Sequence, residues 1–118
     1  MVTVLVVDDE PMIRLVIAED LQDAGFGTVE ASDADEAISI LEARQDIQFV
    51  FTDVNMPGSM DGAKLAAAVR DRWPPVHIII TSGRDEPANM PLHAIFIPKP
   101  YTIEKVIAVI KTFEPSIS

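Results

Sequence analysis

Short apolar runs alternate along this chain with segments in which apolar residues recur at helical spacing. The runs that predict β-strands are 2–7, 28–31, 49–51, 76–81 and 94–97. Residues 49–51 are apolar without a break, which is typical of a strand buried on both faces. Strands that alternate with helices predict an α/β fold, a doubly wound parallel sheet with helices on both faces. Right-handed crossovers then place the carboxyl ends of all strands at one edge of the sheet.

Four intervening segments carry the helical pattern. The residues expected to begin these helices are Pro11, Ser32 or Asp33, Asp61 and Thr102. The third helix is expected over about 63–72. The apolar positions expected to face the core are Ile13, Val16, Ile17, Leu21 and Ala24, then Ala34, Ala37, Ile38 and Leu41, then Leu65, Ala66 and Val69, and finally Ile103, Val106, Ile107, Ile110 and Phe113.

Composition and charge narrow the class of protein. The chain has 118 residues, 48% of them hydrophobic, which fits a single folded domain over residues 1–118. A net charge of −10 argues against direct nucleic-acid binding, because such a surface repels phosphate. No apolar run is long enough to cross a membrane, there is no signal segment, and cysteine is absent. A soluble, cytoplasmic protein is therefore expected.

Functional side chains follow the predicted strands at the same edge of the sheet. They are Asp8, Asp9, Asp53, Ser82 and Lys99. At an effective dielectric near 20, two carboxylates about 4 Å apart repel by roughly 4 kcal/mol, so the acids need a cation. A divalent ion such as Mg²⁺, which prefers oxygen ligands and phosphate, is the natural complement.

This arrangement matches the needs of phosphoryl transfer to an aspartate. The carboxylate of Asp53 is the nucleophile, the cations neutralise the transferring oxygens, and Ser82 can donate a hydrogen bond to one of them. Taken singly, Asp8 or Asp9 fits a helix cap and Ser82 fits a turn. Only their joint position favours a site.

The chain resembles the receiver domains of two-component response regulators over essentially its whole length. The motifs that carry the resemblance are Val4-Leu5-Val6-Val7-Asp8-Asp9-Glu10, Thr52-Asp53-Val54-Asn55-Met56-Pro57, Met60-Asp61-Gly62, Thr81-Ser82-Gly83 and Pro98-Lys99-Pro100-Tyr101. The resemblance implies a flavodoxin-like sheet with strand order 2-1-3-4-5.

The resemblance also implies a role for each site residue. Asp53 would accept a phosphoryl group from the phosphohistidine of a sensor histidine kinase or a histidine phosphotransfer protein. With Asp53 at the metal, Asp9 would bind Mg²⁺ (or Mn²⁺) directly, Asp8 mainly through water, and Asn55 through its backbone carbonyl. Lys99 would pair with the phosphoryl group, and its bond to Pro100 would be cis.

The resemblance also implies which residues would change conformation on phosphorylation and which would set the lifetime of the phosphate. Ser82 matches the switch hydroxyl and Phe96 the aromatic residue that turns inward with it. Asn55 and Arg84 fall where similar domains tune the lifetime of the phosphate. Such a domain is not an enzyme in its own right but assists its own phosphorylation and dephosphorylation, and it passes the signal to an unknown downstream protein, with no membrane or nucleic acid as partner.

Two segments depart from the family pattern. The stretch between Ser82 and Phe96 is short and carries Pro87 and Pro91, so the fourth helix is expected to be one turn at most or an irregular loop. This changes the surface through which many receivers signal. The loop 57–61 is one residue longer than usual, with little effect expected on the site, and the tail 114–118 is expected to fray.

Several functions fit the fold to different degrees. The leading hypothesis is a phospho-accepting switch, acting as a stand-alone protein, which the start at Met1 favours, or as a domain of a longer chain. A relay intermediate and a phosphorylation-independent binding module are the alternatives, although the complete acidic set with Lys99 disfavours the latter. A phosphatase would need an acid where Asn55 stands, and a flavin phosphate would be repelled by the acidic edge.

Overall fold

A parallel sheet between two layers of helices forms the described part of the chain. In the computed structural model, which describes residues 1–56, 60–88 and 90–113, five strands lie in the order β2-β1-β3-β4-β5. The strands are β1 (Thr3–Val7), β2 (Gly27–Ala31), β3 (Phe49–Asp53), β4 (His77–Ser82) and β5 (Ile95–Pro98). The helices are α1 (Pro11–Asp23), α2 (Ala34–Ala43), α3 (Gly62–Arg72) and α4 (Ile103–Lys111). The predicted fold class and strand order are therefore confirmed.

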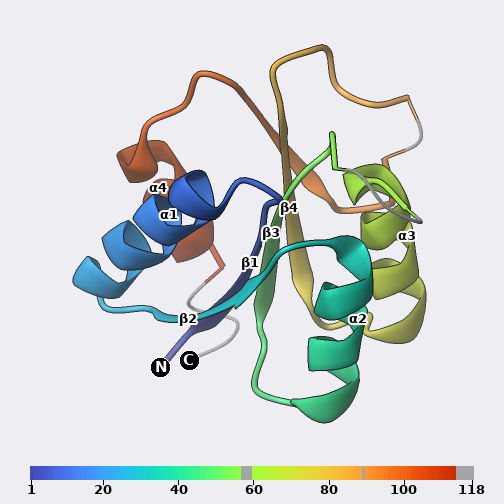
Figure 1. Cartoon of the computed structure of the whole chain (residues 1–118), viewed down its shortest axis with the longest axis horizontal. Helices are drawn as coiled ribbons and strands as arrows, with labels where there is room; N and C mark the ends of the chain where they lie inside the picture. The colour runs from blue at the N-terminus through green and yellow to red at the C-terminus, as the bar shows by residue number, and fades with distance from the viewer. Residues whose placement is uncertain (57–59, 89, 114–118) are drawn as a thin grey trace.

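Each face of the sheet is covered by two helices. Helices α1 and α4 lie on one side and α2 and α3 on the other (Figure 1). Because successive side chains of a strand point to opposite faces, strands β1, β3, β4 and β5 contribute side chains to both cores. Thus Val4 and Val6 pack in the core beneath α1 and α4, whereas Leu5 and Val7 pack in the core beneath α2 and α3.

Three of the helices begin at the predicted capping residues. The side chains of Asp33, Asp61 and Thr102 accept backbone N–H groups at 2.8, 2.9 and 3.2 Å. Such caps satisfy donors that a helix cannot pair internally. Pro11 is the first residue of α1, as predicted. None of the described helices combines the length and the apolar character needed to span a membrane.

The connection between β4 and β5 contains no helix in its described residues. Residues 83–88 and 90–94 form turns and bends, which confirms the prediction of an irregular segment. Proline within a helix removes a hydrogen bond and clashes with the preceding turn, and this segment has Pro87 and Pro91. Residues 57–59 of the long loop and the tail 114–118 lie outside the described residues.

The prediction for the buried face of α1 was partly wrong. The buried side chains are Ile17, Ala18 and Leu21. By contrast, Ile13 and Val16 are 45% and 52% exposed, and Ala24 is exposed as well. Helix α1 contacts β1, β2 and α4, and each residue turns the helix by about 100°. The side that carries Ile13 and Val16 is therefore rotated away from the sheet.

Candidate functional site

The carboxyl ends of four strands bring the predicted polar residues to one edge of the sheet. In chain order these residues are Asp8 after β1, Asp53 at the end of β3, Ser82 at the end of β4 and Lys99 after β5. The sheet itself sets their positions, because the backbone N–H of Lys99 donates to the carbonyl of Ser82 at 2.8 Å. Asp53 lies opposite Thr81 in the β3–β4 register.

Asp53 and Lys99 form the centre of this site. The Lys99 Nζ lies 2.7 Å from Oδ2 of Asp53, and Oδ1 of Asp53 accepts the backbone N–H of Asn55 at 3.1 Å. Asp53 is only 8% exposed, whereas the side chain of Lys99 is 32% exposed, so the carboxylate is the shielded partner of this ion pair. The Lys99–Pro100 bond is cis, as predicted.

Asp8 lies beside this pair and is more deeply buried. Its Oδ1 accepts the backbone N–H of Glu10 at 2.9 Å. Burial raises the pKa of Asp8; the hydrogen bond from Glu10 opposes that rise, and the negative charge of Asp53 adds to it. The nearby Lys99 lowers the pKa in turn, so the carboxylates of Asp8 and Asp53 share one cation.

Asp8→Asn is expected to stabilise the metal-free protein at neutral pH. Because the folded state raises the pKa of Asp8 above its ordinary value of 3.8, it binds a proton more tightly than the unfolded chain does. As the pH rises from about 3.8 through the raised pKa of the folded state, Asp8 loses its proton, and the buried charge lowers the free energy of unfolding. Urea denaturation over a pH series should show that Asp8→Asn has a higher free energy of unfolding than the wild type at neutral pH, and that this difference shrinks toward acid pH. Asp23→Asn, at an exposed position of α1, is the control, and a variant no more stable than wild type at neutral pH would contradict the argument.

Ser82, Arg84 and Phe96, the other predicted residues, lie at this edge or next to it. Ser82 is buried, and its Oγ accepts the backbone N–H of Arg84 at 3.1 Å. The side chain of Arg84 is exposed, and Phe96 packs against the core on the α2 and α3 side. Among the described residues, no hydrogen bond or ion pair joins Ser82 or Arg84 to Asp53.

Arg14 is a structural support of the site that the sequence did not indicate. Its Nη1 donates to the carbonyl oxygen of Asp8 at 2.8 Å, and its Nε donates to Oε1 of Glu30 at 3.0 Å. The guanidinium thereby ties the loop after β1 to β2. In the sequence Arg14 lay within the helical pattern, and nothing there pointed to a partner on β2.

Tyr101 is a second residue whose place only the structure gives. Its ring meets that of Phe51 edge-on, with 5.7 Å between the centroids. Burial, together with the negative charges of Asp8 and Asp53, raises the pKa of Tyr101 to about 12. The aromatic ring two residues after Lys99 was the available signal, but the spacing alone could not show which way the ring points.

Gly62 allows the first turn of α3 to pass directly under the end of β3. Its N–H donates to the carbonyl of Val54 at 2.9 Å. A Cβ atom at this position would lie 2.0 Å from the carbonyl oxygen of Asp53, far inside van der Waals contact. The absence of a side chain at Gly62 is therefore a condition for the backbone position of Asp53.

The oxygen donors at this edge suit a magnesium ion. The residues predicted to hold it are Asp8, Asp9, Asp53 and Asn55. Among the described residues, no three acidic or histidine side chains form a ready-made ligand set. Mg²⁺ needs less than this, since it takes one or two carboxylates, keeps several waters and completes its shell with phosphate oxygens. Asp8 and Asp53, whose charges act on one another, supply that number of carboxylates.

Comparison with known proteins identifies the family. The model of the response regulator receiver domain matches residues 4–111. The chain belongs to this family. Over 115 residues it is 35% identical to the sensor kinase CckA of Brucella abortus (strain 2308). The aligned region covers 92% of this chain and 12% of that protein. It is 33% identical over 118 residues to a putative NtrX-like response regulator of Rickettsia bellii, with 94% of this chain and 24% of that protein covered.

Solved receiver structures have the same fold. The crystal structure of the receiver domain of the hybrid histidine kinase CckA matches with a TM-score of 0.80 and 31% identity, over 93% of this chain and 96% of that one. The response regulator TrrA of Thermotoga maritima, crystallised with Mg²⁺ and BeF, matches with a TM-score of 0.84 and 27% identity, over 95% and 98% of the two chains. The receiver thus spans a small part of the full-length relatives and nearly all of these solved domains.

Proposed function

We propose that this receiver domain is a phospho-accepting signalling switch in which Asp53 takes a phosphoryl group from a phosphohistidine. The observation that carries the proposal is the 2.7 Å pair between Lys99 and the buried carboxylate of Asp53, beside Asp8 at the carboxyl edge of the sheet. Ligands of open α/β sheets bind beyond this edge. The relatives, a sensor kinase and NtrX-like response regulators, support a histidine kinase or histidine phosphotransfer protein as the donor.

The transfer itself is a displacement at phosphorus. A carboxylate oxygen of Asp53 attacks, the new O–P bond forms as the N–P bond breaks, and the electron pair of that bond returns to the imidazole nitrogen of the donor. Lys99 neutralises the transferring oxygens from one side. Asp8, Asp9, Asp53 and the backbone carbonyl of Asn55 would hold Mg²⁺ (or Mn²⁺), which would supply further positive charge there.

Phosphorylation then shifts the population between two conformations. Ser82, whose Oγ now accepts only the N–H of Arg84 within the described residues, donates its hydroxyl hydrogen to a phosphoryl oxygen. Phe96 turns inward as this hydroxyl moves, and the changed surface alters the affinity for a downstream protein. Arg84 and Asn55 tune the lifetime of the phosphate. The domain assists its own phosphorylation and dephosphorylation without acting on a separate substrate.

The proposed phosphoryl donor also indicates where in the cell this protein acts and at which step of a signalling pathway. A kinase that draws its phosphoryl group from ATP places this role in the cytoplasm. A second candidate, the intermediate of a phosphorelay, is favoured by the likeness to the receiver of a hybrid histidine kinase. In that role the phosphoryl group leaves Asp53 for a second histidine, whereas a terminal switch keeps it until water removes it.

Incubation with acetyl phosphate and Mg²⁺, followed by intact mass spectrometry, tests the proposal. One phosphoryl adduct is expected in the wild type, and none in Asp53→Asn or with the metal chelated. Asp46→Asn, at an exposed carboxylate outside the site, is the matched control and should form the adduct as the wild type does. A wild type without an adduct, or an adduct that persists in Asp53→Asn, would refute the assignment.

A further inference from the structure

Thr81 carries a buried hydroxyl group that has nothing to bond. In the part of the chain that the structure describes, its Oγ1 is the one buried side-chain polar atom without a hydrogen-bond partner. The residue is 1% exposed. Burying a hydroxyl without a partner destabilises a protein, and a valine would have nearly the same shape without that effect. The stability of this conformation therefore does not explain a threonine at position 81.

Thr81 lies next to the phosphoacceptor on the same side of the sheet. It is paired with Asp53 in the β3–β4 register, and the backbone N–H of Val54 donates to its carbonyl at 3.0 Å. Two residues earlier, Phe51 and Ile79 are paired in the same way, and both side chains lie in the core beneath α1 and α4. Because neighbouring strands are only about 4.8 Å apart, the hydroxyl of Thr81 is an immediate neighbour of the Asp53 side chain.

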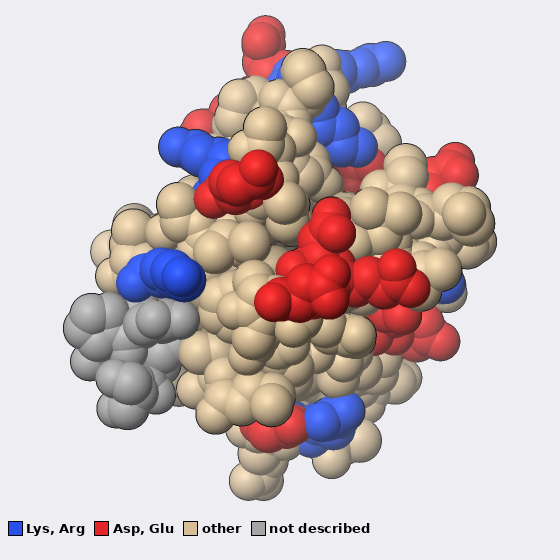
Figure 2. All heavy atoms as spheres, turned by 90° about the vertical axis from the view of Figure 1, so that its left-hand side faces the viewer, with Lys and Arg blue, Asp and Glu red and all other residues tan. Residues whose placement is uncertain are grey.

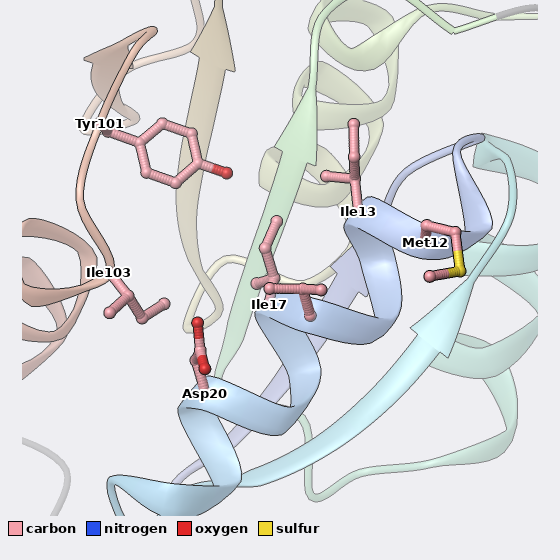
Figure 3. Close-up of a pocket in the computed structure, with 7 residues that line it drawn as sticks. Met12, Ile13, Ile17, Asp20, Tyr101 and Ile103 are labelled. Carbon is pink, nitrogen blue, oxygen red and sulfur yellow. The ribbon is translucent and has the colours of Figure 1, made fainter.

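The layer of helices α1 and α4 separates Thr81 from solvent. These helices cover this face of the sheet (Figure 1), and Figure 2 shows the outer surface on their side of the molecule. Tyr101 lines the groove between the two helices. Figure 3 shows its hydroxyl on the side of β3, where its ring meets that of Phe51. With 1% of Thr81 exposed, bulk water does not supply the missing bond, so a partner must come from within the site.

The hydroxyl of Ser82 lies on the other side of β4. Ile78 and Ile80 pack in the core beneath α2 and α3, and side chains alternate along a strand, so Ser82 belongs to that side as well. Its Oγ accepts the backbone N–H of Arg84 at 3.1 Å. The switch role proposed for Ser82 therefore leaves Thr81 unexplained.

The oxygens of Asp53 have other donors in this structure. Oδ1 accepts the N–H of Asn55, and Oδ2 accepts from the Nζ of Lys99. Lys99 follows β5, so its side chain reaches Asp53 across the end of β4, the strand between β3 and β5. In the proposed reaction this ammonium turns to the phosphoryl oxygens and leaves the carboxyl group. The hydroxyl of Thr81, on the strand in between, is then a donor within reach after rotation about its χ1 bond.

We propose that Thr81 donates a hydrogen bond to phosphorylated Asp53, at the carboxyl oxygen that does not carry phosphorus, and thereby shortens the lifetime of the phosphate. This inference rests on the proposed function and adds a residue to it. In hydrolysis a water oxygen attacks phosphorus, the bond from phosphorus to the Asp53 oxygen breaks, and its electron pair returns to the carboxylate. The proton of the water passes to solvent. Because the hydrogen bond from Thr81 strengthens as this negative charge develops, it lowers the barrier.

Thr81→Val tests whether the hydroxyl lacks a partner before phosphorylation. Without metal, the urea midpoint should rise by about 0.5 M, since the valine removes an unsatisfied buried hydroxyl. With Mg²⁺ and beryllofluoride, a phosphoryl mimic, this advantage over the wild type should disappear, because the hydroxyl then has its acceptor. An equal or lower midpoint without metal would mean that the hydroxyl is already satisfied, for example by a buried water, and would overturn the inference. An advantage that beryllofluoride leaves undiminished would overturn it too.

Thr52→Val is the matched control for the stability measurement. Thr52 is equally buried, but its hydroxyl already donates to the carbonyl oxygen of Asp53 at 3.0 Å. Its replacement should lower the urea midpoint by the same amount with and without beryllofluoride. Thr81→Ser keeps the hydroxyl and should therefore keep the wild-type response to beryllofluoride. A Thr81→Ser variant that responds as Thr81→Val does would show that the methyl group matters and not the hydroxyl.

The lifetime of the acetyl phosphate adduct tests the role in hydrolysis. After removal of the donor, intact mass spectrometry over time should show an adduct that lasts about fivefold longer in Thr81→Val and as long as the wild type in Thr81→Ser. The difference between threonine and valine should persist in a Tyr101→Phe background; its loss there would assign the effect to the tyrosine hydroxyl and overturn the proposal.

The same measurement separates this inference from the proposed function. Equal lifetimes in Thr81→Val and the wild type, or an adduct that fails to form in Thr81→Val alone, would refute the role of Thr81 and leave the proposed function standing. A wild type that forms no adduct would refute the proposed function and this inference with it.

Discussion

Replacing Lys99 by methionine is expected to slow the phosphorylation of Asp53 about a hundredfold or more, the usual loss when a group that stabilises transition-state charge is removed. The Nζ of Lys99 already lies 2.7 Å from Oδ2 of Asp53, so it is in place to neutralise the oxygens of the incoming phosphoryl group. The methionine keeps most of the length and the apolar stem of the side chain and removes the ammonium group with its charge and its hydrogen bond to Asp53. The rate of adduct formation from acetyl phosphate, followed by intact mass, measures the effect.

The same substitution should strengthen the binding of Mg²⁺. In the metal-free protein the ammonium of Lys99 occupies an oxygen of Asp53 and offsets the negative charge that acts on Asp8. Without this ammonium group, the negative charges of Asp8 and Asp53 depend more on a bound metal ion for neutralisation. Calorimetric titration should therefore show a lower dissociation constant together with the slower transfer. Lys105→Met, at an exposed position of α4, is the control for both measurements. Slower transfer with equally weakened Mg²⁺ binding would instead indicate a collapsed site.

Gly62→Ala is expected to cost about 3 kcal/mol of unfolding free energy, at the upper end of ordinary overpacking. The new Cβ would lie 2.0 Å from the carbonyl oxygen of Asp53 and 2.9 Å from Cα of Val54. Both neighbours are backbone atoms, which cannot rotate away as a side chain can. The start of α3 must therefore move away from the end of β3, and the phosphoacceptor moves with it. Urea denaturation measures the loss of stability, and adduct formation should slow in parallel.

Gly83→Ala provides the matched comparison for this prediction. A Cβ at Gly83 would meet no atom within 4 Å. Alanine there restricts the unfolded chain without a clash, so stability should stay constant or rise by a few tenths of a kcal/mol, about the effect known for compatible glycines. Similar losses in the two variants would mean that backbone freedom, and not the close approach to Asp53, explains the glycine at position 62.

Local rules explain why much of this fold was predictable. The caps at Asp33, Asp61 and Thr102 each depend on a side chain and a backbone N–H three residues later, so short stretches of sequence suffice. The candidate site was predictable for a related reason. Asp53 ends a strand and Lys99 directly follows one, and a parallel sheet must bring such positions to one edge.

The exposed side of α1 shows where sequence reasoning failed. Periodicity places Ile13 and Val16 on an apolar stripe, but it does not say how wide a stripe the sheet and the neighbouring helix will cover. That width depends on how α1 sits against β1, β2 and α4, which are distant in the chain. The two side chains were therefore predicted as core and are instead half exposed.

The sequence by itself determined the order of strands and helices along the chain and the edge at which the acids and Lys99 gather. These depend on periodicity, capping and the geometry of parallel sheets. The direct ion pair between Lys99 and Asp53 comes from the structure. Only the tertiary structure decided that Arg14 ties the loop of Asp8 to Glu30, and that Tyr101 lies between Phe51 and the groove. The physical reason is that side-chain direction and helix placement are set by packing among distant elements, and no local pattern encodes that packing.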